Sequence, residues 1–264
     1  MPQDEDCVLL AVDRGIARVT FNRPEQLNAI SLAMHRRLNE ILDDLQQRDD
    51  IRVMLLTGNG RAFCAGQDLS ERNVERDGPL DLGESLEARY NPLVRRLVSL
   101  PFPFVSAVNG VAAGAGANIA LLADIVIARE SARFIQSFAK IGLMPDCGGS
   151  WTLPHLVGQP RALAIAMTGE PVNGRDAANW GMIWKAVPDD AFDDAVEALV
   201  RDVAAAPTKG LMETRDAIRG AWTRSFAEQL VVERDGQRRL GRTRDYREGV
   251  SAFKDRRTAK FQGH

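Results

Sequence analysis

Residues 104–129, FVSAVNGVAAGAGANIALLADIVIAR, contain two strand patterns and one helix pattern within a short segment. The segment begins with the apolar run FVSAVNG, passes through the glycine-rich turn VAAGAGA and a short apolar helix, and ends with DIVIA. Short apolar runs that are bounded by turn residues are typical of buried strands. A strand, a turn, a helix and a second strand in this order predict an α/β fold.

The first sixty residues show the same alternation. Strand patterns occur at CVLLAV (7–12), IARVTF (16–21) and RVMLLT (52–57), and a helix opened by Ser31 precedes the third of them. The apolar residues of this helix recur at helical spacing: Met34, Leu38, Ile41, Leu42 and Leu45. We therefore expect a helix with one buried face and with His35 on its polar side.

The pattern becomes helical after Pro188. A helix is marked by apolar residues from Phe192 to Val203, and two or three further helical segments follow as far as Phe261. We therefore expect two regions, a core domain with an α/β pattern over residues 1–188 and a helical region over residues 189–264.

Length and composition limit the classes of protein and partner. With 264 residues, 45% of them apolar, the chain is long enough to bury a sizeable core. Its 34 basic and 36 acidic side chains leave a net charge of -2, which argues against a broad basic face for nucleic acid or an anionic membrane. The N-terminal MPQDEDCVLL has acids where a signal peptide carries basic residues, and no apolar run approaches the roughly 18 residues that span a bilayer. We expect a cytoplasmic protein that binds neither membranes nor nucleic acid.

The cysteines and histidines do not have the spacing of a metal site. Cys7, Cys64 and Cys147 lie far apart and form no CxxC pair, so we expect reduced core thiols and no disulfide framework or zinc site. The three histidines have no ligand spacing, and none accompanies a Ser or Cys nucleophile. The sequence predicts neither a metal site nor a redox cofactor.

The glycine-rich turn is a candidate anion site. Gly114, Ala115 and Gly116 precede a helix, but Ile119 stands where a dinucleotide-binding GxGxxG motif has its third glycine, so we discount NAD binding. Backbone N–H groups of such a turn point outward at a helix N-terminus, where the helix dipole favours negative charge. The turn would supply half of an oxyanion hole. The alternative is a turn that needs glycine only for its backbone angles or for close packing.

A second candidate donor lies in FCAGQD, residues 63–68. Its small residues would allow a ligand carbonyl to approach the backbone of Ala65. The alternative is a surface turn in which Asp68 caps the next segment. Residues 58–79 are mostly polar and glycine-punctuated, which predicts a loop with a mobile stretch around residues 73–79.

One carboxylate, Asp146, lies in the otherwise uncharged stretch IGLMPDCGG, residues 141–149. Pro145 fixes the backbone before it, and two glycines follow Cys147. A desolvated carboxylate has a raised pKa, which suits a base that accepts and returns a proton near neutral pH. The alternative is an aspartate that caps a helix beginning around Ser150.

Taken together, these segments resemble the enoyl-CoA hydratase/isomerase (crotonase) family over almost the whole chain. The matching motifs are FNRPEQLNAI (21–30), AFCAGQDL (62–69), AVNGVAAGAGANIAL (107–121) and REGVSAF (247–253). Within the family the chain is most similar to the ring-1,2-epoxyphenylacetyl-CoA isomerases of phenylacetate degradation. That similarity rests on FCAGQDLSERNV (63–74), YNPLVRRL (90–97), GLMPDCGGSW (142–151), WGMIW (180–184) and DYREGVSAF (245–253).

The resemblance implies a ClpP/crotonase-like ββα spiral core with a helical C-terminal region that builds a homotrimer or a dimer of trimers. It implies an acyl-CoA thioester as substrate, with the CoA as part of the substrate and no further cofactor. Carried over residue by residue, the catalytic groups are the backbone N–H groups of Ala65 and Ala115 as oxyanion donors and Asp146 as the proton carrier. The residues implied to contact substrate or CoA are Gly66, Gln67, Asp68, Gly114, Asn118, Phe138, Phe253 and Arg256, the last two from a neighbouring subunit.

The resemblance also favours isomerisation over hydration. Hydratases of the family use two glutamates, and Asn118 and Phe138 stand at those positions here. We therefore expect an acyl-CoA isomerase that acts on an epoxidised phenylacetyl-CoA, on 3-enoyl-CoA, or on both. Two alternatives stay open: an enoyl-CoA hydratase, and a non-catalytic crotonase-fold binding protein.

Overall fold

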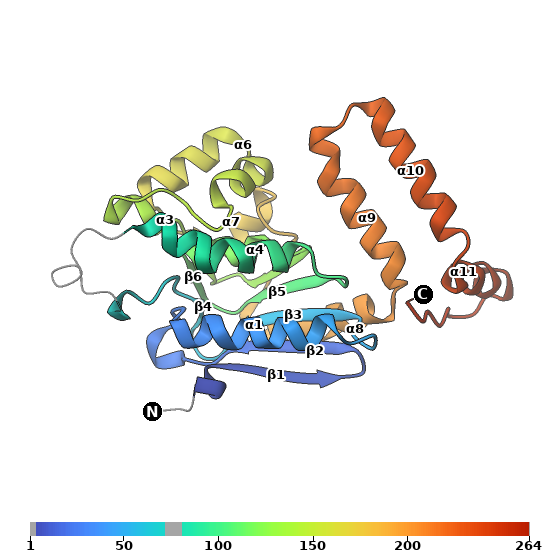
Figure 1. Cartoon of the computed structure of the whole chain (residues 1–264), viewed down its shortest axis with the longest axis horizontal. Coiled ribbons are helices and arrows are strands. Elements are labelled where there is room, and N and C mark those ends of the chain that lie inside the picture. The colour runs from blue at the N-terminus through green and yellow to red at the C-terminus, as the bar shows by residue number, and fades with distance from the viewer. Residues whose placement is uncertain (1–3, 72–80, 264) are drawn as a thin grey trace.

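The computed structural model describes residues 4–71 and 81–263. The stretch around residues 73–79, which we expect to be mobile, lies outside them. Within the described residues the strands form two sheets, and helices cover them and extend to one side of the molecule (Figure 1).

The larger sheet has six described strands, and all neighbours in it are parallel except β1 and β2. In spatial order they are β1 (Val8–Asp13), β2 (Ile16–Phe21), β3 (Val53–Gly58), β5 (Phe104–Val108), β7 (Ile125–Arg129) and β10 (Lys185–Val187). The smaller sheet has four described strands, with only the last pair antiparallel. They are β4 (Ala62–Cys64), β6 (Val111–Ala113), β8 (Arg133–Ile135) and β9 (Val172–Asn173).

The two sheets are joined by a repeated connection. Strands β3, β5 and β7 of the larger sheet each continue, after a turn of two or three residues, into β4, β6 and β8 of the smaller one. This arrangement confirms the predicted α/β fold with a ββα spiral. The loop and turn expected at residues 62–64 and 111–113 were wrong, because both segments pair as short strands. Three residues are too few for a strand period to show in the sequence.

The helices follow the predicted positions, with additions. Along the chain they are α1 (Leu32–Gln46), α3 (Leu82–Ser85), the π-helical segment η4 (Leu86–Tyr90), α4 (Asn91–Val98), α5 (Ala115–Leu121), α6 (Gly149–Thr168), α7 (Gly174–Asn179), α8 (Phe192–Ala205), α9 (Thr208–Gly220), α10 (Phe226–Leu240) and α11 (Arg244–Asp255). Short 3-10 turns include η3 (Leu69–Glu71) and η5 (Ser137–Ile141). The Ser31 side chain accepts a hydrogen bond from the Met34 N–H and so caps α1, as expected for a serine at this position.

The expectation that His35 lies on the polar face of α1 was wrong. His35 is 6% exposed, and its ring packs edge-on against Tyr90 with the ring centroids 4.4 Å apart. Tyr90 ends η4, which continues into α4 as a second covering layer over α1. A helix that carries another helix on its side buries residues that a single apolar face would leave exposed.

The C-terminal helices divide into two parts. Helix α8 packs on the larger sheet, where Phe192, Val196 and Val200 meet apolar residues of that sheet. Helices α9, α10 and α11 extend away from the sheets, and we call them the arm (Figure 1). The helical region that begins at residue 189 therefore starts with a helix that covers the core sheet.

Arg219 of α9 connects the arm to the core. Its guanidinium donates to the carbonyl oxygens of Val98 and Leu122, at 3.0 and 2.8 Å, and lies 2.8 Å from a carboxylate oxygen of Asp124. Cations near exposed carbonyl groups at helix ends are stabilising. The base of the arm is thus held by polar contacts to the segments on either side of β5.

Candidate active site

In the segment around Gly66, the Gln67 N–H has no hydrogen-bond partner within the described residues. Ile30 donates to the Gly66 carbonyl at 2.7 Å and accepts from the Asp68 N–H at 3.0 Å, so the two chains form a parallel bridge at Gln67. In a parallel bridge the middle residue turns its own N–H away from the partner strand. Among the described residues the Gln67 N–H has no hydrogen-bond acceptor.

The same hydrogen bonds correct the prediction for Ala65. The Ala65 N–H donates to the Leu27 carbonyl at 3.0 Å, so this donor is already used. The small residues around Gly66 indicate where a ligand can approach, but they do not indicate which N–H is available to it. The bridge to Ile30, which assigns the free N–H to Gln67, is a tertiary contact.

Asp68 has a structural role. Its carboxylate accepts from the Ser70 N–H and hydroxyl, at 3.1 and 2.6 Å, and pairs with Arg23 at 2.8 Å. Burial alone would raise its pKa, but the hydrogen bonds from Ser70 and Arg23 outweigh burial and hold the pKa below its ordinary value. The capping role that the sequence offered for Asp68 is confirmed, and its oxygens are occupied.

The glycine-rich turn lies against this segment. A Cβ added to Gly66 would lie 2.9 Å from the Ala113 carbonyl oxygen and 3.5 Å from the Ala115 nitrogen. Gly66 has φ +93°, a conformation that favours glycine. Ala115 is the first residue of α5, so its N–H is one of those that a helix leaves without an internal acceptor. The N–H groups of Gln67 and Ala115 therefore belong to two adjoining segments.

Gly116 brings α5 close to β4. A Cβ at this position would lie 2.7 Å from the Cys64 sulfur, closer than real Cβ contacts. The packing explanation for this glycine is thus confirmed at Gly116. The same close packing holds the start of α5 in place, and with it the Ala115 N–H.

Asn118 of α5 holds the loop that carries Asp146. Its amide nitrogen donates to the Asp146 carbonyl at 2.9 Å, and its amide oxygen accepts from Gln136 at 2.8 Å. A Cβ on Gly149 would lie 2.6 Å from the Asn118 amide oxygen, so α6 begins directly against this side chain. Asn118 is thus an uncharged side chain whose amide nitrogen and amide oxygen each make a hydrogen bond.

The Asp146 carboxyl group has one buried oxygen, Oδ1, that makes no hydrogen bond within the described residues. Burial raises the pKa of Asp146, and a hydrogen bond from the Cys147 thiol opposes this effect in part. Helix α6 has Gly148 as its N-cap and no side-chain cap, so the alternative role of Asp146 as a helix cap is wrong.

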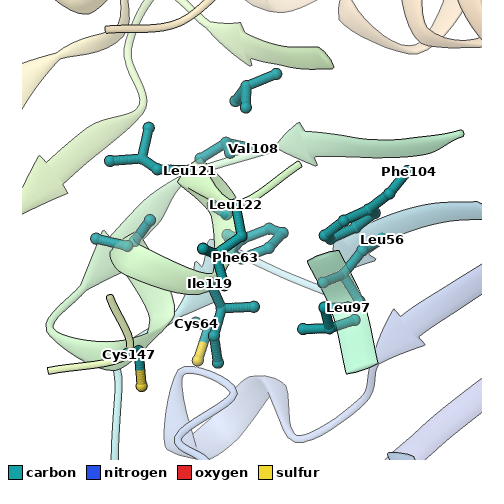
Figure 2. Close-up of a cluster of buried hydrophobic side chains, with 14 of the residues drawn as sticks. Leu56, Phe63, Cys64, Leu97, Phe104, Val108, Ile119, Leu121, Leu122 and Cys147 are labelled. Carbon is teal, nitrogen blue, oxygen red and sulfur yellow. The ribbon is translucent and has the colours of Figure 1, made fainter. Parts of the chain in front are cut away.

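The surroundings of Asp146 are apolar. Cys147 and Cys64 lie at one end of a cluster of buried side chains, with Ile119 and Leu122 beside them (Figure 2). Phe138 is also buried, and a Cβ on Gly114 would lie 3.7 Å from its ring. This low-dielectric environment is the physical cause of the raised pKa of Asp146.

The other predicted site residues lie on the arm. Phe253 is 86% exposed on α11, and Arg256 ends that helix with φ +53°. Figure 1 shows α11 beyond α9 and α10, on the side away from the core. A single chain therefore does not bring these two residues to the Asp146 loop.

Two polar residues near Asp146 were missed by sequence reasoning. Tyr90 and Gln136 are buried, at 2% and 3% exposure. Tyr90 lies in YNPLVRRL, one of the segments quoted above for the resemblance to the epoxyphenylacetyl-CoA isomerases, but nothing in its spacing marks its hydroxyl as buried. Gln136 directly precedes η5, and only its hydrogen bond to Asn118 reveals a role.

A family model described as enoyl-CoA hydratase/isomerase matches residues 11–264. The chain belongs to this family. It is 51% identical over 257 residues to the 1,2-epoxyphenylacetyl-CoA isomerase of Escherichia coli K12, covering 97% of this chain and 98% of the relative. It is 34% identical over 262 residues to the trans-2-decenoyl-[acyl-carrier-protein] isomerase of Streptococcus mutans, covering 97% and 98%.

Solved structures agree with this membership. An enoyl-CoA hydratase from Bacillus anthracis superposes with a TM-score of 0.90 at 28% identity, covering 98% of this chain and 100% of that one. The predicted family and crotonase fold are confirmed, and the chain is an enzyme of the enoyl-CoA hydratase/isomerase family. In the part of the chain that the structure describes, no helix is long and apolar enough to cross a membrane. Residues 4–71 and 81–263 also contain no group of three or more His, Cys, Asp or Glu side chains that could hold a metal ion.

Proposed function

We propose that this enzyme is an acyl-CoA isomerase whose substrate is 2-(1,2-epoxy-1,2-dihydrophenyl)acetyl-CoA and whose product is oxepin-CoA. One observation carries the proposal: among the described residues of the site, Asp146 is the carboxyl group with a buried oxygen that lacks a hydrogen-bond partner, and uncharged residues stand at both hydratase acid positions. The similarity to the 1,2-epoxyphenylacetyl-CoA isomerase of Escherichia coli supports the choice of acyl group.

In the proposed mechanism the thioester carbonyl oxygen accepts hydrogen bonds from the N–H groups of Gln67 and Ala115. These donors stabilise the negative charge that develops on this oxygen when a proton leaves the α carbon. One such donor is worth roughly 10²–10³ in rate in other acyl-transfer enzymes. Because both donors are backbone groups on tightly packed segments, they need little reorganisation during the reaction.

Asp146 is proposed to move the proton. Its carboxylate takes a proton from the methylene between the ring and the thioester, where both neighbours acidify the carbon. The carbon–carbon bond shared by the ring and the epoxide breaks as the ring expands, and Asp146 returns the proton to a ring carbon. No water is added and the formula is unchanged. A base with a raised pKa suits both the removal and the return of a proton.

The same groups support a second isomerisation, of 3-enoyl-CoA to 2-enoyl-CoA. This reaction also needs one shuttling base and one oxyanion hole, and its proton moves from the α carbon to the γ carbon without any ring expansion. Hydration needs a base for water and an acid for the α carbon, and neither Asn118 nor Phe138 supplies one. We therefore propose that hydration is at most a side activity.

The substrate CoA is proposed to reach a neighbouring subunit of a homotrimer or a dimer of trimers. Phe253 and Arg256 would contact it from the arm of that neighbour, which agrees with their distance from Asp146 within one chain. The enzyme is further proposed to act in the cytoplasm, without a cofactor other than the CoA of its substrate.

The test is to incubate the enzyme with the epoxide generated in place and to follow the product by mass and ultraviolet absorbance. Oxepin-CoA with an unchanged mass is the expected product, and crotonyl-CoA should give negligible hydration. Good activity on linear 3-enoyl-CoAs without oxepin formation would make this a fatty-acyl isomerase. A robust hydratase rate would contradict the assigned reaction class.

A further inference from the structure

Tyr90 combines burial with an unsatisfied hydroxyl group. The residue is 2% exposed, and its hydroxyl has no hydrogen-bond partner among the described residues. A buried hydroxyl without a partner is destabilising, and such groups are rare in folded proteins. A ligand that supplies an acceptor would remove this destabilisation.

The backbone that carries Tyr90 is unusual. Tyr90 is the last residue of η4, a π-helical turn between α3 and α4, and the Asn91 N–H donates to the Leu86 carbonyl. Such turns are uncommon and frequently occur at functional sites, because they redirect a side chain from a regular helix. Here the turn places the phenol in the same buried cluster as Cys64 and Cys147.

The Tyr90 hydroxyl lies within electrostatic range of the proposed base. Burial raises the pKa of Tyr90, and the nearby Cys147 and Asp146 side chains raise it further. No hydrogen bond joins Tyr90 to Asp146, although Asp146 Oδ1 is also buried without a partner in the part of the chain that is described. Two unsatisfied polar groups therefore belong to one buried region without satisfying each other.

His35 does not supply the missing partner. Neither of its ring nitrogens has a hydrogen bond within the described residues, and its ring packs edge-on against the Tyr90 ring. Burial, followed by the nearby Arg89 charge, lowers the pKa of His35 to about 4, so the ring is neutral near pH 7. His35 thus fixes the position of the phenol without adding a charge beside Asp146.

We propose that the Tyr90 hydroxyl donates a hydrogen bond to an oxygen atom of the acyl group and thereby selects acyl groups that carry a ring oxygen. This inference rests on the proposed function, because it extends the same site beyond the thioester. A phenol that donated to Asp146 instead would stabilise the carboxylate and weaken it as a base. An ether or epoxide oxygen of the substrate accepts the hydrogen bond without that effect.

The experiment compares two unreactive ligands on two proteins. Dissociation constants of 2-hydroxyphenylacetyl-CoA and phenylacetyl-CoA are measured by calorimetry for the wild type and for Tyr90→Phe, which removes only the hydroxyl. We expect the wild type to bind the oxygenated ligand about three- to ten-fold tighter, as for one neutral hydrogen bond. Tyr90→Phe should bind both ligands equally. Tyr246→Phe removes a hydroxyl from a residue that is 56% exposed on α11, and it should keep the wild-type preference.

A second readout uses turnover. Tyr90→Phe should lower kcat/KM for the epoxide about three- to ten-fold and leave the rate on linear 3-enoyl-CoA, which lacks a ring oxygen, within about two-fold. An equal loss on both substrates, or no preference in the wild type, would overturn the proposal. If Tyr90→Phe fails to fold, the dissociation constants of ortho-, meta- and para-hydroxyphenylacetyl-CoA are compared on the wild type. One fixed donor should favour one position of the hydroxyl, and equal affinities for all three would overturn the proposal.

The two proposals fail separately. If the wild type does not convert the epoxide but Tyr90→Phe abolishes the binding preference, the proposed reaction is wrong and the role of Tyr90 stands. If the epoxide is converted and no preference exists, the reaction stands and the role of Tyr90 is wrong.

Discussion

Helices α5 and α11 are built in opposite ways. Every residue of α5 is buried, and its polar contribution comes from the Ala115 N–H at its start and from Asn118. In α11 only Asp245 and Ala252 are buried, and five of the other ten residues are charged. In the proposed mechanism the core acts through backbone N–H groups and the Asp146 carboxyl group, which close packing holds in place. The arm would act through exposed side chains, and water and salt weaken the interactions of its charges.

The largest expected effect of a core substitution is that of Asp146→Asn. The amide keeps the shape of the side chain but cannot accept a proton, so kcat should fall by roughly 10²–10⁴. Calorimetry should show that acyl-CoA binding is largely kept. Near-normal turnover would remove Asp146 from the mechanism and contradict its proposed role as the base.

Asn118→Ala tests whether the core depends on paired polar groups. It removes the donor to the Asp146 carbonyl and the acceptor of Gln136, which leaves buried groups unsatisfied. We expect a loss of about 1–3 kcal/mol in the free energy of unfolding, together with a lower kcat. Denaturant titration and initial rates measure the two effects. The exposed Asn59→Ala is the control, and equal stability of the two variants would contradict a positioning role for Asn118.

Arg219→Ala tests how much the contacts of Arg219 stabilise the attachment of the arm to the core. The change removes two hydrogen bonds to carbonyl groups and the ion pair with Asp124. Because Arg219 is partly exposed, we expect a smaller loss of about 1–2 kcal/mol, most of it at the base of α9. Hydrogen exchange should increase in α9 and stay unchanged in α5. Faster exchange in both helices would show that arm and core unfold as one unit.

The Cys147 thiol should influence the pH dependence of kcat/KM through its hydrogen bond to Asp146. Asp146 must be ionised to act as a base, and burial raises its pKa, so the acidic limb of the kcat/KM profile should lie above the ordinary range of aspartate. Cys147→Ala removes a hydrogen bond that favours the carboxylate, which should move this limb to higher pH. Cys147→Ser keeps a donor and should move it to lower pH relative to Cys147→Ala. Identical profiles for the two variants would contradict this contact.

The smallest expected effect is that of Arg256→Ala on the arm. If this side chain meets a CoA phosphate, KM should rise about two- to five-fold with kcat nearly unchanged, as expected for uniform binding. The increase should shrink at high salt, because exposed charges are screened. Arg14→Ala, at an exposed turn between β1 and β2, is the control. An unchanged KM would remove Arg256 from the CoA site.

The sequence predicted local elements well and the relation between segments less well. Strands β2 and β5 and the cap of α1 follow from apolar runs and turn residues within a few positions. The burial of His35 depends on a helix that lies more than fifty residues later in the chain. The choice of Gln67 over Ala65 depends on a bridge to Ile30. Contacts between distant segments produce no periodic pattern of apolar residues in the sequence.

The same difference between local features and contacts between segments applies to the candidate site. Asp146 was recognisable because it is a lone carboxylate in an uncharged stretch. Tyr90 was not recognisable, because a tyrosine in an amphipathic helix is usually explained by packing alone. Its unsatisfied hydroxyl is visible only when the surroundings of the side chain are known.

The close fit of Asn118 against Gly149 has a consequence for evolution. Any side chain at position 149 would collide with the Asn118 amide, and a longer acid at position 118 would press on the start of α6. Neither position can change freely while the other stays fixed. Across descendants of a common ancestor, we expect the residues at these two positions to vary together. A route from this enzyme to a hydratase would then have to pass through paired substitutions, because a single glutamate at position 118 would displace the loop that holds Asp146.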